Sequence, residues 1–498
     1  MWLRPFTFLK KKSKYFQSRT MIDINLLRAD KGGNPDLVRE SQRKRGGEKA
    51  VQLVDEVIEL DNNWKIARFN ANELNKQINE IGKKIQPLAK AKKLDSPEAL
   101  ELKNQKDTLT KQQEELKLIA TQKEQLLNKK LRLIGNIVHE SVVDSNDEAN
   151  NKIIGKWWPQ GRDEDSEKEK RGKLVVDGKG VPGLYSHHEV LEKISGYDPV
   201  RGANVAGHRG YFLTGPGVDL NLALMQYGLD FLENNGYTKL WTPFFMRKEM
   251  MSKTAQLEEF DEALYNVSGE EGDEKYLIAT SEQPISAFHA DEWFSDASEL
   301  PKKYAGTSTC FRKEAGAHGR DTWGIFRVHQ FEKIEQFCLT EPEKSWDMHL
   351  EMLHVAEQFY RSLGLPYHVI SIVSGALNNS AAAKYDLEAY FPFQGEYKEL
   401  VSCSNCTDYQ TRELEIRFGA KKMNDTTKKY VHALNCTLTA TERTMCCILE
   451  NYQTENGFIV PEVLRKYMNG KEFIPFKEEK KAKKEKKGSD VPKAAKKQ

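Results

Sequence analysis

Apolar residues recur every seven positions, in two interleaved series, along residues 50–88. The first series is Ala50, Val57, Trp64, Ala71, Ile78 and Ile85, and the second is Leu53, Leu60, Ala67, Leu74, Ile81 and Leu88. Two apolar positions kept in register over several heptads predict a helix that packs along one seam in a coiled coil. At about 1.5 Å per residue, such a helix is roughly 55–60 Å long.

A second periodic stretch follows after a short break. Its apolar positions are Leu102, Leu109, Leu116, Ile119, Leu126 and Ile137, and the break at residues 86–100 contains Pro87 and Pro97. A break this short joins two helices that run antiparallel. Because two helices alone cannot enclose a core, we expect this hairpin to project as an arm from a larger body.

Lysines are frequent on the outer positions of the arm, with glutamates interspersed. They are Lys76, Lys83, Lys84, Lys90, Lys92, Lys93, Lys103, Lys106 and Lys111. Taken alone, this pattern is typical of the solvated face of a coiled coil. The alternative is a finger that lies along the phosphates of a nucleic acid.

The pattern changes near residue 150. Short β-branched and aromatic runs, at residues 276–280, 324–339 and 367–373, alternate with helical stretches near 218–236 and 342–364. The expected strands outnumber the helices and show no regular strand–helix alternation. This part of the chain is therefore predicted to be an antiparallel α+β domain rather than a doubly wound parallel one.

Composition and charge add a few limits. The chain has 498 residues, of which 39% are hydrophobic and 30% charged, and its net charge is +2. This length predicts two or three domains. No apolar run is long enough for a transmembrane helix, so we expect no membrane partner. Seven cysteines, an odd number in a long chain, favour a reducing compartment over a disulfide framework.

The two ends of the chain differ from the rest. Residues 1–20 hold six basic and no acidic residues, which weakly matches a mitochondrial targeting segment. The alternatives are a disordered extension and an upstream start, since Met21 begins a more ordinary sequence. Residues 477–498 are rich in lysine and poor in apolar residues, so we expect a disordered tail that either attracts nucleic acid or only aids solubility.

The densest group of site-like residues lies between residues 309 and 333. Arg312 and Glu314 precede a glycine-rich charged loop, and Arg327 and Phe331 follow it. Two strands joined by this loop would bring two guanidinium groups, a carboxylate and an aromatic ring around one small volume. Such a volume suits a ligand that is flat, anionic and polar.

Three stretches, in order, resemble the three motifs of class II aminoacyl-tRNA synthetases. Residues 236–249 resemble motif 1, residues 311–314 with 327–331 resemble motif 2, and residues 440–453 resemble motif 3. The arm in front of them is distinctive of the seryl-tRNA synthetases. The stretches "YLIATSEQP", "LVSCSNCTDYQTRE" and "MIDINLLRADKGGNPDLVRESQRKRG" are also similar to the eukaryotic cytosolic members of that family.

The resemblance covers residues 21–476 and implies a domain plan. Residues 21–145 would form an N-terminal tRNA-binding domain with a coiled-coil arm. Residues 150–476 would form a class II catalytic domain, an antiparallel β-sheet flanked by helices. The family's activity is that of a serine–tRNA ligase, which joins L-serine to tRNA(Ser), and by extension to tRNA(Sec). A cytoplasmic homodimer is implied as well.

The resemblance also implies an ATP site with Mg²⁺. Its residues would be Arg312, Glu314, Val328, Phe331, Glu399, Ser402 and Arg443, with Arg312, Glu314 and Arg443 as the catalytic set and Glu399 holding the metal with Ser402. Activation brings the carboxylate of the amino acid to the α-phosphate of ATP, so two anions must meet. A bridging arginine such as Arg312 lowers their repulsion, most of all in the transition state.

The serine site implied by the resemblance consists of Thr280, Glu282, Arg312, Glu335 and Asn435. A pocket that hydrogen-bonds the serine hydroxyl rejects alanine, because the polar groups of the pocket would stay unpaired. Glu335 is expected to meet the ammonium and hydroxyl groups of the substrate. On an extended strand Phe331, Lys333 and Glu335 share one face.

Two other functions are alternatives to ligase activity. A catalytically silent, RNA-binding relative would keep the arm and lose the site, and the intact Arg312, Glu314 and Arg443 argue against it. A coiled-coil interaction protein would not need the polar motifs between residues 200 and 470. With the resemblance included, the arm is interpreted as an RNA-binding element that reads shape and phosphates rather than base edges.

Overall fold

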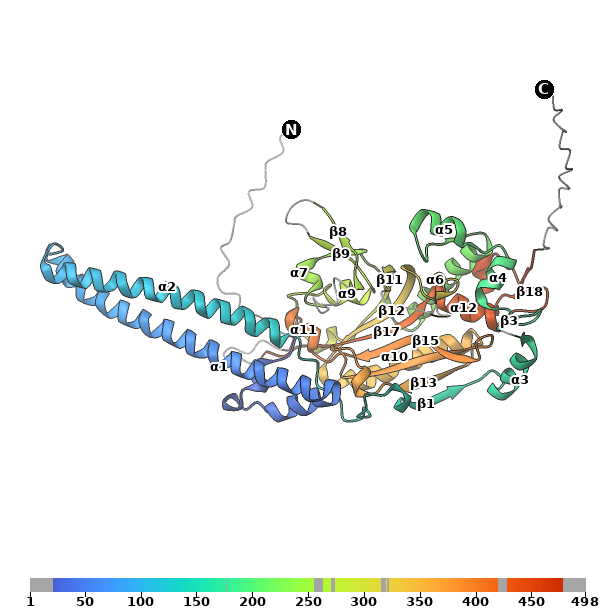
Figure 1. Cartoon of the computed structure of the whole chain (residues 1–498), viewed down its shortest axis with the longest axis horizontal. Helices are drawn as coiled ribbons and strands as arrows, with labels where there is room; N and C mark the ends of the chain where they lie inside the picture. Colours follow the sequence, from blue (N-terminus) through green and yellow to red (C-terminus); the bar gives the residue numbers. More distant parts are fainter. Residues whose placement is uncertain are drawn as a thin grey trace, which may run out of the picture.

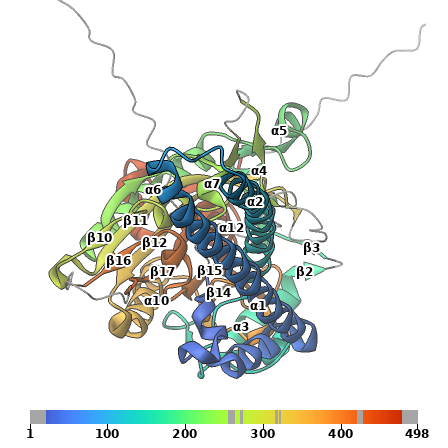
Figure 2. The same cartoon turned by 90° about the vertical axis from the view of Figure 1, so that its left-hand side faces the viewer.

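Two long helices pack side by side and extend away from the rest of the chain (Figure 1). They are α1 (Pro35–Lys90) and α2 (Pro97–Leu131) in a computed structural model. The structure describes residues 21–176, 178–254, 263–269, 274–314, 319, 322–419 and 428–477. Figure 2 looks along the arm, with both helices in front of the body. The predicted coiled-coil arm is confirmed.

Local chemistry explains where the arm helices begin. Asn34 caps α1 by accepting a hydrogen bond from the backbone of Leu37 at 3.2 Å, and Ser96 caps α2 by accepting one from Ala99 at 3.3 Å. Both helices have proline in the first turn, where no intrahelical amide partner is lost.

A kink in α1 separates the arm from its anchor. Gly46 and Gly47 have non-helical backbone angles, so the residues before them turn along the body. In that first segment the Gln42 amide exchanges two hydrogen bonds with the backbone of Gly135, at 2.9 and 3.1 Å. The second helix ends at residue 131 and not at 137 as predicted, because residues 132–138 bond to the body instead; Asn136 donates to the Ser380 carbonyl at 2.8 Å.

The body is built around one eight-stranded sheet. In spatial order its strands are β1 (Lys152–Trp157), β13 (Tyr367–Ser371), β14 (Ala383–Phe391), β15 (Glu396–Asn405), β17 (His432–Ala440), β12 (Gln330–Thr340), β11 (Lys302–Phe311) and β6 (Thr238–Trp241). All neighbouring pairs are antiparallel except β11 with β6. The predicted antiparallel α+β body is therefore confirmed.

Three helices cover one face of this sheet: α6 (Pro216–Asn234), α10 (Ser345–Ser362) and α12 (Thr441–Asn451). They meet one another, since Tyr227 of α6 stacks on Phe359 of α10 with ring centroids 5.3 Å apart. On β12, Ile334 and Cys338 join the core under these helices. The alternate residues Phe331, Lys333 and Glu335 therefore face the opposite side, which is left for a site.

Shorter elements complete the body. The helices are α3 (Glu164–Leu174), α4 (His187–Lys193), α5 (Pro199–Ala206), α7 (Lys248–Met251), α9 (Glu282–Ser286), α11 (Tyr409–Glu413) and α13 (Glu462–Arg465). The small strands are β2 (Val175–Val176), β3 (Lys179–Gly180), β4 (Tyr197–Asp198), β5 (Phe212–Leu213), β7 (Phe245–Arg247), β8 (Asn266–Val267), β9 (Lys275–Leu277), β10 (Trp293–Phe294), β16 (Arg417–Phe418), β18 (Gly457–Ile459) and β19 (Phe473–Pro475).

One predicted strand begins later than expected, and two predicted segments lie outside the described residues. The strand predicted over 324–339 begins only at Gln330, because Gly324 has φ +59° and residues 322–329 run through turns. The proposed targeting segment, residues 1–20, and the lysine-rich tail beyond residue 477 lie outside the described residues. Within those residues, no helix is both long and apolar enough to cross a bilayer.

Candidate active site

A cleft opens on the face of the sheet opposite the helices, and its space is about 510 Å³ when the open solvent at its mouth is included. Its walls come from the ends of β11 and β12, from β15 and β17, and from the first turn of α12. The lining residues are Arg312, Glu314, Phe326, Arg327, Val328, Phe331, Lys333, Glu399, Leu400, Thr437, Ala440, Glu442 and Arg443. Six residues assigned to the ATP site from the sequence thus meet in one place: Arg312, Glu314, Val328, Phe331, Glu399 and Arg443.

The two sides of the motif 2 hairpin are fixed to each other at the cleft. The backbone amide of Arg312 donates to the His329 carbonyl at 2.9 Å, which continues the antiparallel pairing of β11 with β12. The Arg312 side chain donates from Nε to the Ala279 carbonyl at 3.2 Å, and its Cζ lies 5.2 Å from the centroid of the Phe331 ring. A guanidinium and an aromatic face are therefore held side by side.

Glu314 supplies the carboxylate at the same end. Its Oε2 lies 3.5 Å from Nη1 of Arg327, and the Glu314 backbone has φ +49°, which only a few per cent of non-glycine residues adopt. The predicted group of two guanidiniums, a carboxylate and a ring around one volume is confirmed. Such strained backbone is common at binding sites.

Arg443 closes another side of the cleft. It donates from Nη1 to the backbone carbonyl of Glu399 at 3.2 Å, and its Cζ lies 5.0 Å from the centroid of Phe326. Burial, together with the nearby positive charges of Arg312 and Arg327, lowers the pKa of Arg443. Three cations so close together favour the binding of a polyanion.

Oxygen atoms from β14 and β15 gather beside Arg443. The Glu399 carboxylate is about half exposed and 3.7 Å from Arg443, while Ser402 pairs across the ladder with Asp386. Burial and the charge of Glu399 raise the pKa of Asp386 to about 7, and its Oδ1 is buried without a hydrogen-bond partner among the described residues. A carboxylate, a hydroxyl and an unsatisfied carboxyl oxygen fit the ligand preference of Mg²⁺.

Glu335 lies one layer below the cleft and is almost fully buried. Its Oε2 accepts hydrogen bonds from Thr280 Oγ1 at 2.6 Å, Ser281 Oγ at 2.9 Å and the Glu282 amide at 3.1 Å. Its Oε1 lies 2.8 Å from Lys333 Nζ. Although burial opposes ionisation, Lys333 and these donors lower the pKa of Glu335 below its usual value.

Lys333 is a site residue to which sequence reasoning gave no role. It is buried, it lines the cleft, and its ammonium bridges Glu335 at 2.8 Å and Thr280 Oγ1 at 3.0 Å. The available signal was strand alternation, which puts Lys333 between Phe331 and Glu335 on one face. What the sequence could not supply was the pairing with Thr280, 53 residues away.

The other two residues predicted to bind serine lie near this cluster. The Glu282 carboxylate accepts from Gln410 Nε2 at 2.9 Å, and burial and the charge of Glu335 raise the pKa of Glu282 above its usual value. Asn435 is buried on β17, two residues from Thr437, which pairs with Glu335 across the ladder and lines the cleft. Ser402, Thr280, Glu282, Glu335 and Asn435 are thus neighbours of the cleft rather than part of its lining.

Comparisons with known proteins agree with this arrangement. Residues 265–452 match the family model of the tRNA synthetase class II core domain (G, H, P, S and T), and residues 21–138 match that of the seryl-tRNA synthetase N-terminal domain. The cytoplasmic serine–tRNA ligase of Schizosaccharomyces pombe is 58% identical over 461 residues, which cover 92% of this chain and 97% of that protein. The chain belongs to the seryl-tRNA synthetase family.

Further relatives agree with this membership. The cytoplasmic serine–tRNA ligase of Saccharomyces cerevisiae is 56% identical, over 92% of this chain and 96% of that protein. The cytoplasmic serine–tRNA ligase of Naegleria fowleri, solved in complex with AMP, is 50% identical with a TM-score of 0.77. The seryl-tRNA synthetase of Pyrococcus horikoshii, complexed with ATP, is 38% identical with a TM-score of 0.78. Both alignments cover 92% of this chain and 100% of the solved chain.

The buried pair of Lys333 and Glu335 makes a prediction for stability. Lys333→Met leaves Glu335 buried without its cation, and breaking a buried pair in this way costs about 3–5 kcal/mol. Lys303→Met on the neighbouring strand β11 is the matched control, because its partner Glu351 is about half exposed and such a pair contributes about 1 kcal/mol or less. Urea denaturation of both variants measures the difference. Equal losses would contradict the role given to the buried pair.

Proposed function

We propose that this protein is a serine–tRNA ligase, which first makes seryl-adenylate and then esterifies the terminal ribose of tRNA(Ser). The observation that supports this proposal most is the meeting of Arg312, Glu314, Phe331 and Arg443 around one cleft. The family membership and the nucleotides bound in the solved relatives support ATP as the ligand of that cleft.

In the proposed ATP complex the adenine ring stacks on Phe331, and its amino group donates to Glu314. Arg443 offers its guanidinium to the opposite face of the ring and to the outer phosphates. Arg312 lies beside Phe331 and bridges the α-phosphate and the carboxylate of serine. That carboxylate is already ionised, so its attack on phosphorus needs no general base. The rate then depends on positioning and on charge stabilisation.

The magnesium ion belongs to this proposal as well. Glu399 and Ser402 would hold it, with Asp386 behind Ser402, because these side chains gather oxygen atoms at the cleft edge. When bound, the ion would neutralise phosphate charge. The contribution of the protein there is a rigid β14–β15 ladder that keeps the oxygen atoms in place.

Serine would lie between the α-phosphate and the cluster of Lys333, Thr280 and Glu335. The negative charge of Glu335, held below the cleft, supports an assignment to the substrate ammonium and hydroxyl, with Asn435 and Glu282 completing the wall. Serine would take over part of the hydrogen bonding within this cluster through its hydroxyl group, whereas alanine has no group that replaces a displaced hydrogen bond. Pyrophosphate exchange measured with each of the twenty amino acids is the test, and we expect serine to support it alone. Exchange with none, or with another amino acid, overturns the proposal.

Arg312 is expected to act on the transition state of activation. Arg312→Lys keeps one positive charge but loses the planar fork that bridges two anions, so the pyrophosphate exchange rate should fall about 10²–10³-fold. Arg361→Lys is the control, because Arg361 of α10 lies away from the cleft and pairs with Glu357. An Arg312→Lys rate within about threefold of wild type would remove Arg312 from the mechanism.

The arm is proposed to bind the tRNA. It extends away from the cleft, and its two helices carry exposed lysines at many outer positions, which suits contact with phosphates (Figure 1). Because such contacts read shape and charge, a second tRNA of similar outline would also be accepted. On that ground we include tRNA(Sec) in the proposal.

Shortening the arm should separate the two steps of the reaction. Glu56 pairs with Lys130 and Asn75 with Gln113, so residues 67 and 120 lie opposite each other. Replacing residues 68–119 with a short glycine-rich turn should leave serine activation within about threefold of wild type. Serine transfer should fall about 10²-fold or more, because several phosphate contacts are lost. A parallel loss in both assays from a folded variant would contradict the proposal.

A homodimer is proposed at the β6 edge of the sheet. Among the residues that the structure describes, β6 pairs on one side only, with β11, and Trp241 is 68% exposed. Leu222 and Val218 of the adjoining helix α6 are exposed as well. An open strand edge with exposed apolar residues on the adjoining helix favours an interface. The names of the relatives support a cytoplasmic location for this dimer.

Trp241→Glu tests the dimer. A charge at the centre of the interface should convert the dimer to a monomer in size-exclusion chromatography with light scattering. Leu350→Glu places the same charge at an exposed apolar position of α10 and should leave the dimer intact. A wild-type protein that is monomeric, or a Trp241→Glu variant that stays dimeric, would contradict the proposed interface.

A further inference from the structure

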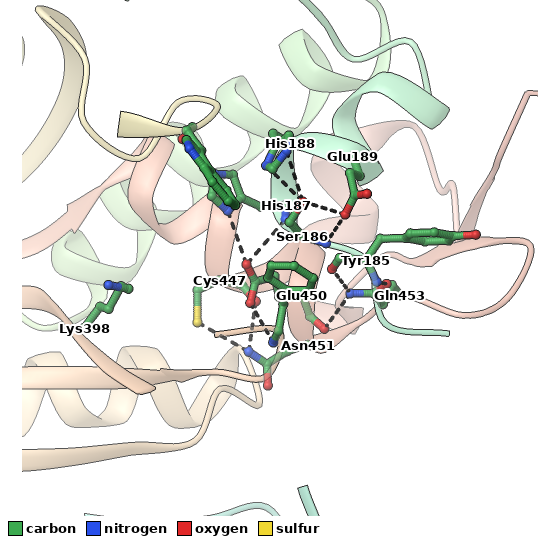
Figure 3. A network of polar contacts seen from close by, with 12 residues as sticks. Tyr185, Ser186, His187, His188, Glu189, Lys398, Cys447, Glu450, Asn451 and Gln453 are labelled. Atoms are coloured by element: carbon green, nitrogen blue, oxygen red, sulfur yellow. Dashed lines mark hydrogen bonds and ion pairs between the residues drawn. The ribbon is translucent and has the colours of Figure 1, made fainter. Parts of the chain in front are cut away.

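A buried histidine joins α4 to α12 behind the cleft. Figure 3 shows His187 beside Glu450, within a network that also includes Tyr185, Ser186 and Gln453. His187 is 1% exposed and Glu450 is 2% exposed. The Nδ1 of His187 lies 3.2 Å from Glu450 Oε1, and Glu450 Oε2 accepts from the Phe393 amide at 3.0 Å. Each oxygen of this buried carboxylate therefore has a partner.

The second ring nitrogen of His187 contacts the chain that returns from the motif 2 loop. Its Nε2 lies 3.1 Å from the backbone carbonyl of Trp323. With Glu450 ionised, both partners of the ring can only accept, so both ring nitrogens donate and His187 is an imidazolium. Burial opposes this charge, but Cys446 and Glu450 raise the pKa of His187 well above its usual value.

Gly324 lets the returning chain come this close. Its φ is +59°, and a Cβ added there would lie 2.7 Å from His187 Nε2. Only glycine meets both requirements without strain. Of the residues that follow, Ile325, Phe326 and Val328 are buried, and the chain leads directly into the cleft, which Phe326, Arg327 and Val328 line.

The His187–Glu450 pair is connected to Arg443 through α12. Arg443 and Glu450 are seven residues apart, about two helical turns, and so lie on one face of the helix. Arg443 contacts Phe326 at 5.0 Å between Cζ and the ring centroid. Phe326 is thus held by Arg443 on one side, and its backbone is held by the His187–Trp323 contact three residues earlier.

We propose that His187 is a positioning residue for the nucleotide. It fixes the positions of Phe326 and Arg327 relative to Arg443, and so sets the affinity for ATP. This inference rests on the proposed function, because it takes the cleft to be the ATP site. His187 does not touch the cleft, and its effect passes through the Trp323 carbonyl.

The fold of α4 has other anchors, which makes the inference testable. Ser186 and Glu189 form a capping box at the start of α4, with the Ser186 amide 2.8 Å from Glu189 Oε2. Gln453 donates to the Tyr185 carbonyl at 2.8 Å and accepts from the Tyr185 amide. The capping box stabilises the start of α4, and the two bonds of Gln453 hold this start against the end of α12 without His187 (Figure 3).

The experiment is pyrophosphate exchange by full-length His187→Gln at varied ATP and at varied serine. We expect the KM for ATP to rise about tenfold, which corresponds to about 1.4 kcal/mol. The KM for serine and the kcat at saturating ATP should stay within about threefold. The double variant His187→Gln with Glu450→Gln, which leaves no unpaired buried charge, should show the same rise in the KM for ATP.

Tyr452→Phe is the control for a merely structural effect. It removes the 2.7 Å hydrogen bond from Tyr452 to the Leu363 carbonyl, just after α12, and leaves His187 untouched. Its melting temperature should fall without a change in the KM for ATP. Equal increases in both KM values of His187→Gln, or an unchanged KM for ATP, would overturn the inference.

Two further outcomes call for a different measurement each. If His187→Gln does not fold, Gly324→Ala disturbs the same contact from the other side, and it should raise the KM for ATP alone; an unchanged value overturns the inference. If wild-type protein shows no serine-dependent exchange, the proposed function fails. The effect of His187 on nucleotide affinity is then measured by direct binding of a fluorescent ATP analogue. His187→Gln should weaken this binding, and Tyr452→Phe should not.

Discussion

Mutual repulsion among three guanidinium groups is the constraint around which the site is arranged. Arg312, Arg327 and Arg443 share one cleft, and burial together with the charges of the first two lowers the pKa of the third. Glu314 and Glu399 offset part of this repulsion at 3.5 and 3.7 Å, and both carboxylates are at the cleft wall. A cleft that is left short of negative charge attracts a polyanion, and the packing of the sheet and its helices limits how far the arginines can move apart.

The sheet and its helices supply that rigidity. Residues of β12 alternate between the core under α6, α10 and α12 and the cleft on the other face, so packing on one side fixes the side chains on the other. The Glu335–Lys333 pair uses the same geometry one layer deeper. The cleft thus belongs to the body alone, while the kink at Gly46 and Gly47 directs the arm away from it.

Periodicity in the sequence was sufficient to predict the arm and the class of the body. Heptads predict helices well because packing along a seam is a local requirement. The predicted end of α2 is wrong because Asn136 bonds to Ser380, and the periodicity of the sequence contains no information on this tertiary contact. The predicted start of β12 is wrong for a related reason. The backbone turns at Gly324, where it lies close to His187.

The candidate site was predictable only in part. Arg312, Glu314, Phe331 and Arg443 could be grouped because they lie in motifs whose order is known from the resemblance. Lys333 had no motif role, and its importance depends on Thr280, which is distant in sequence. His187 does not line the cleft, and its proposed positioning role follows from the two acceptors that face its ring.

A crystal structure of the protein with a non-hydrolysable seryl-adenylate analogue tests the central claim most directly. The account predicts the adenine ring on Phe331 with its amino group at Glu314, the phosphate mimic at Arg312, and the seryl ammonium directed at Glu335. An analogue bound elsewhere, or bound in this cleft with its seryl group directed away from Lys333 and Glu335, would contradict it.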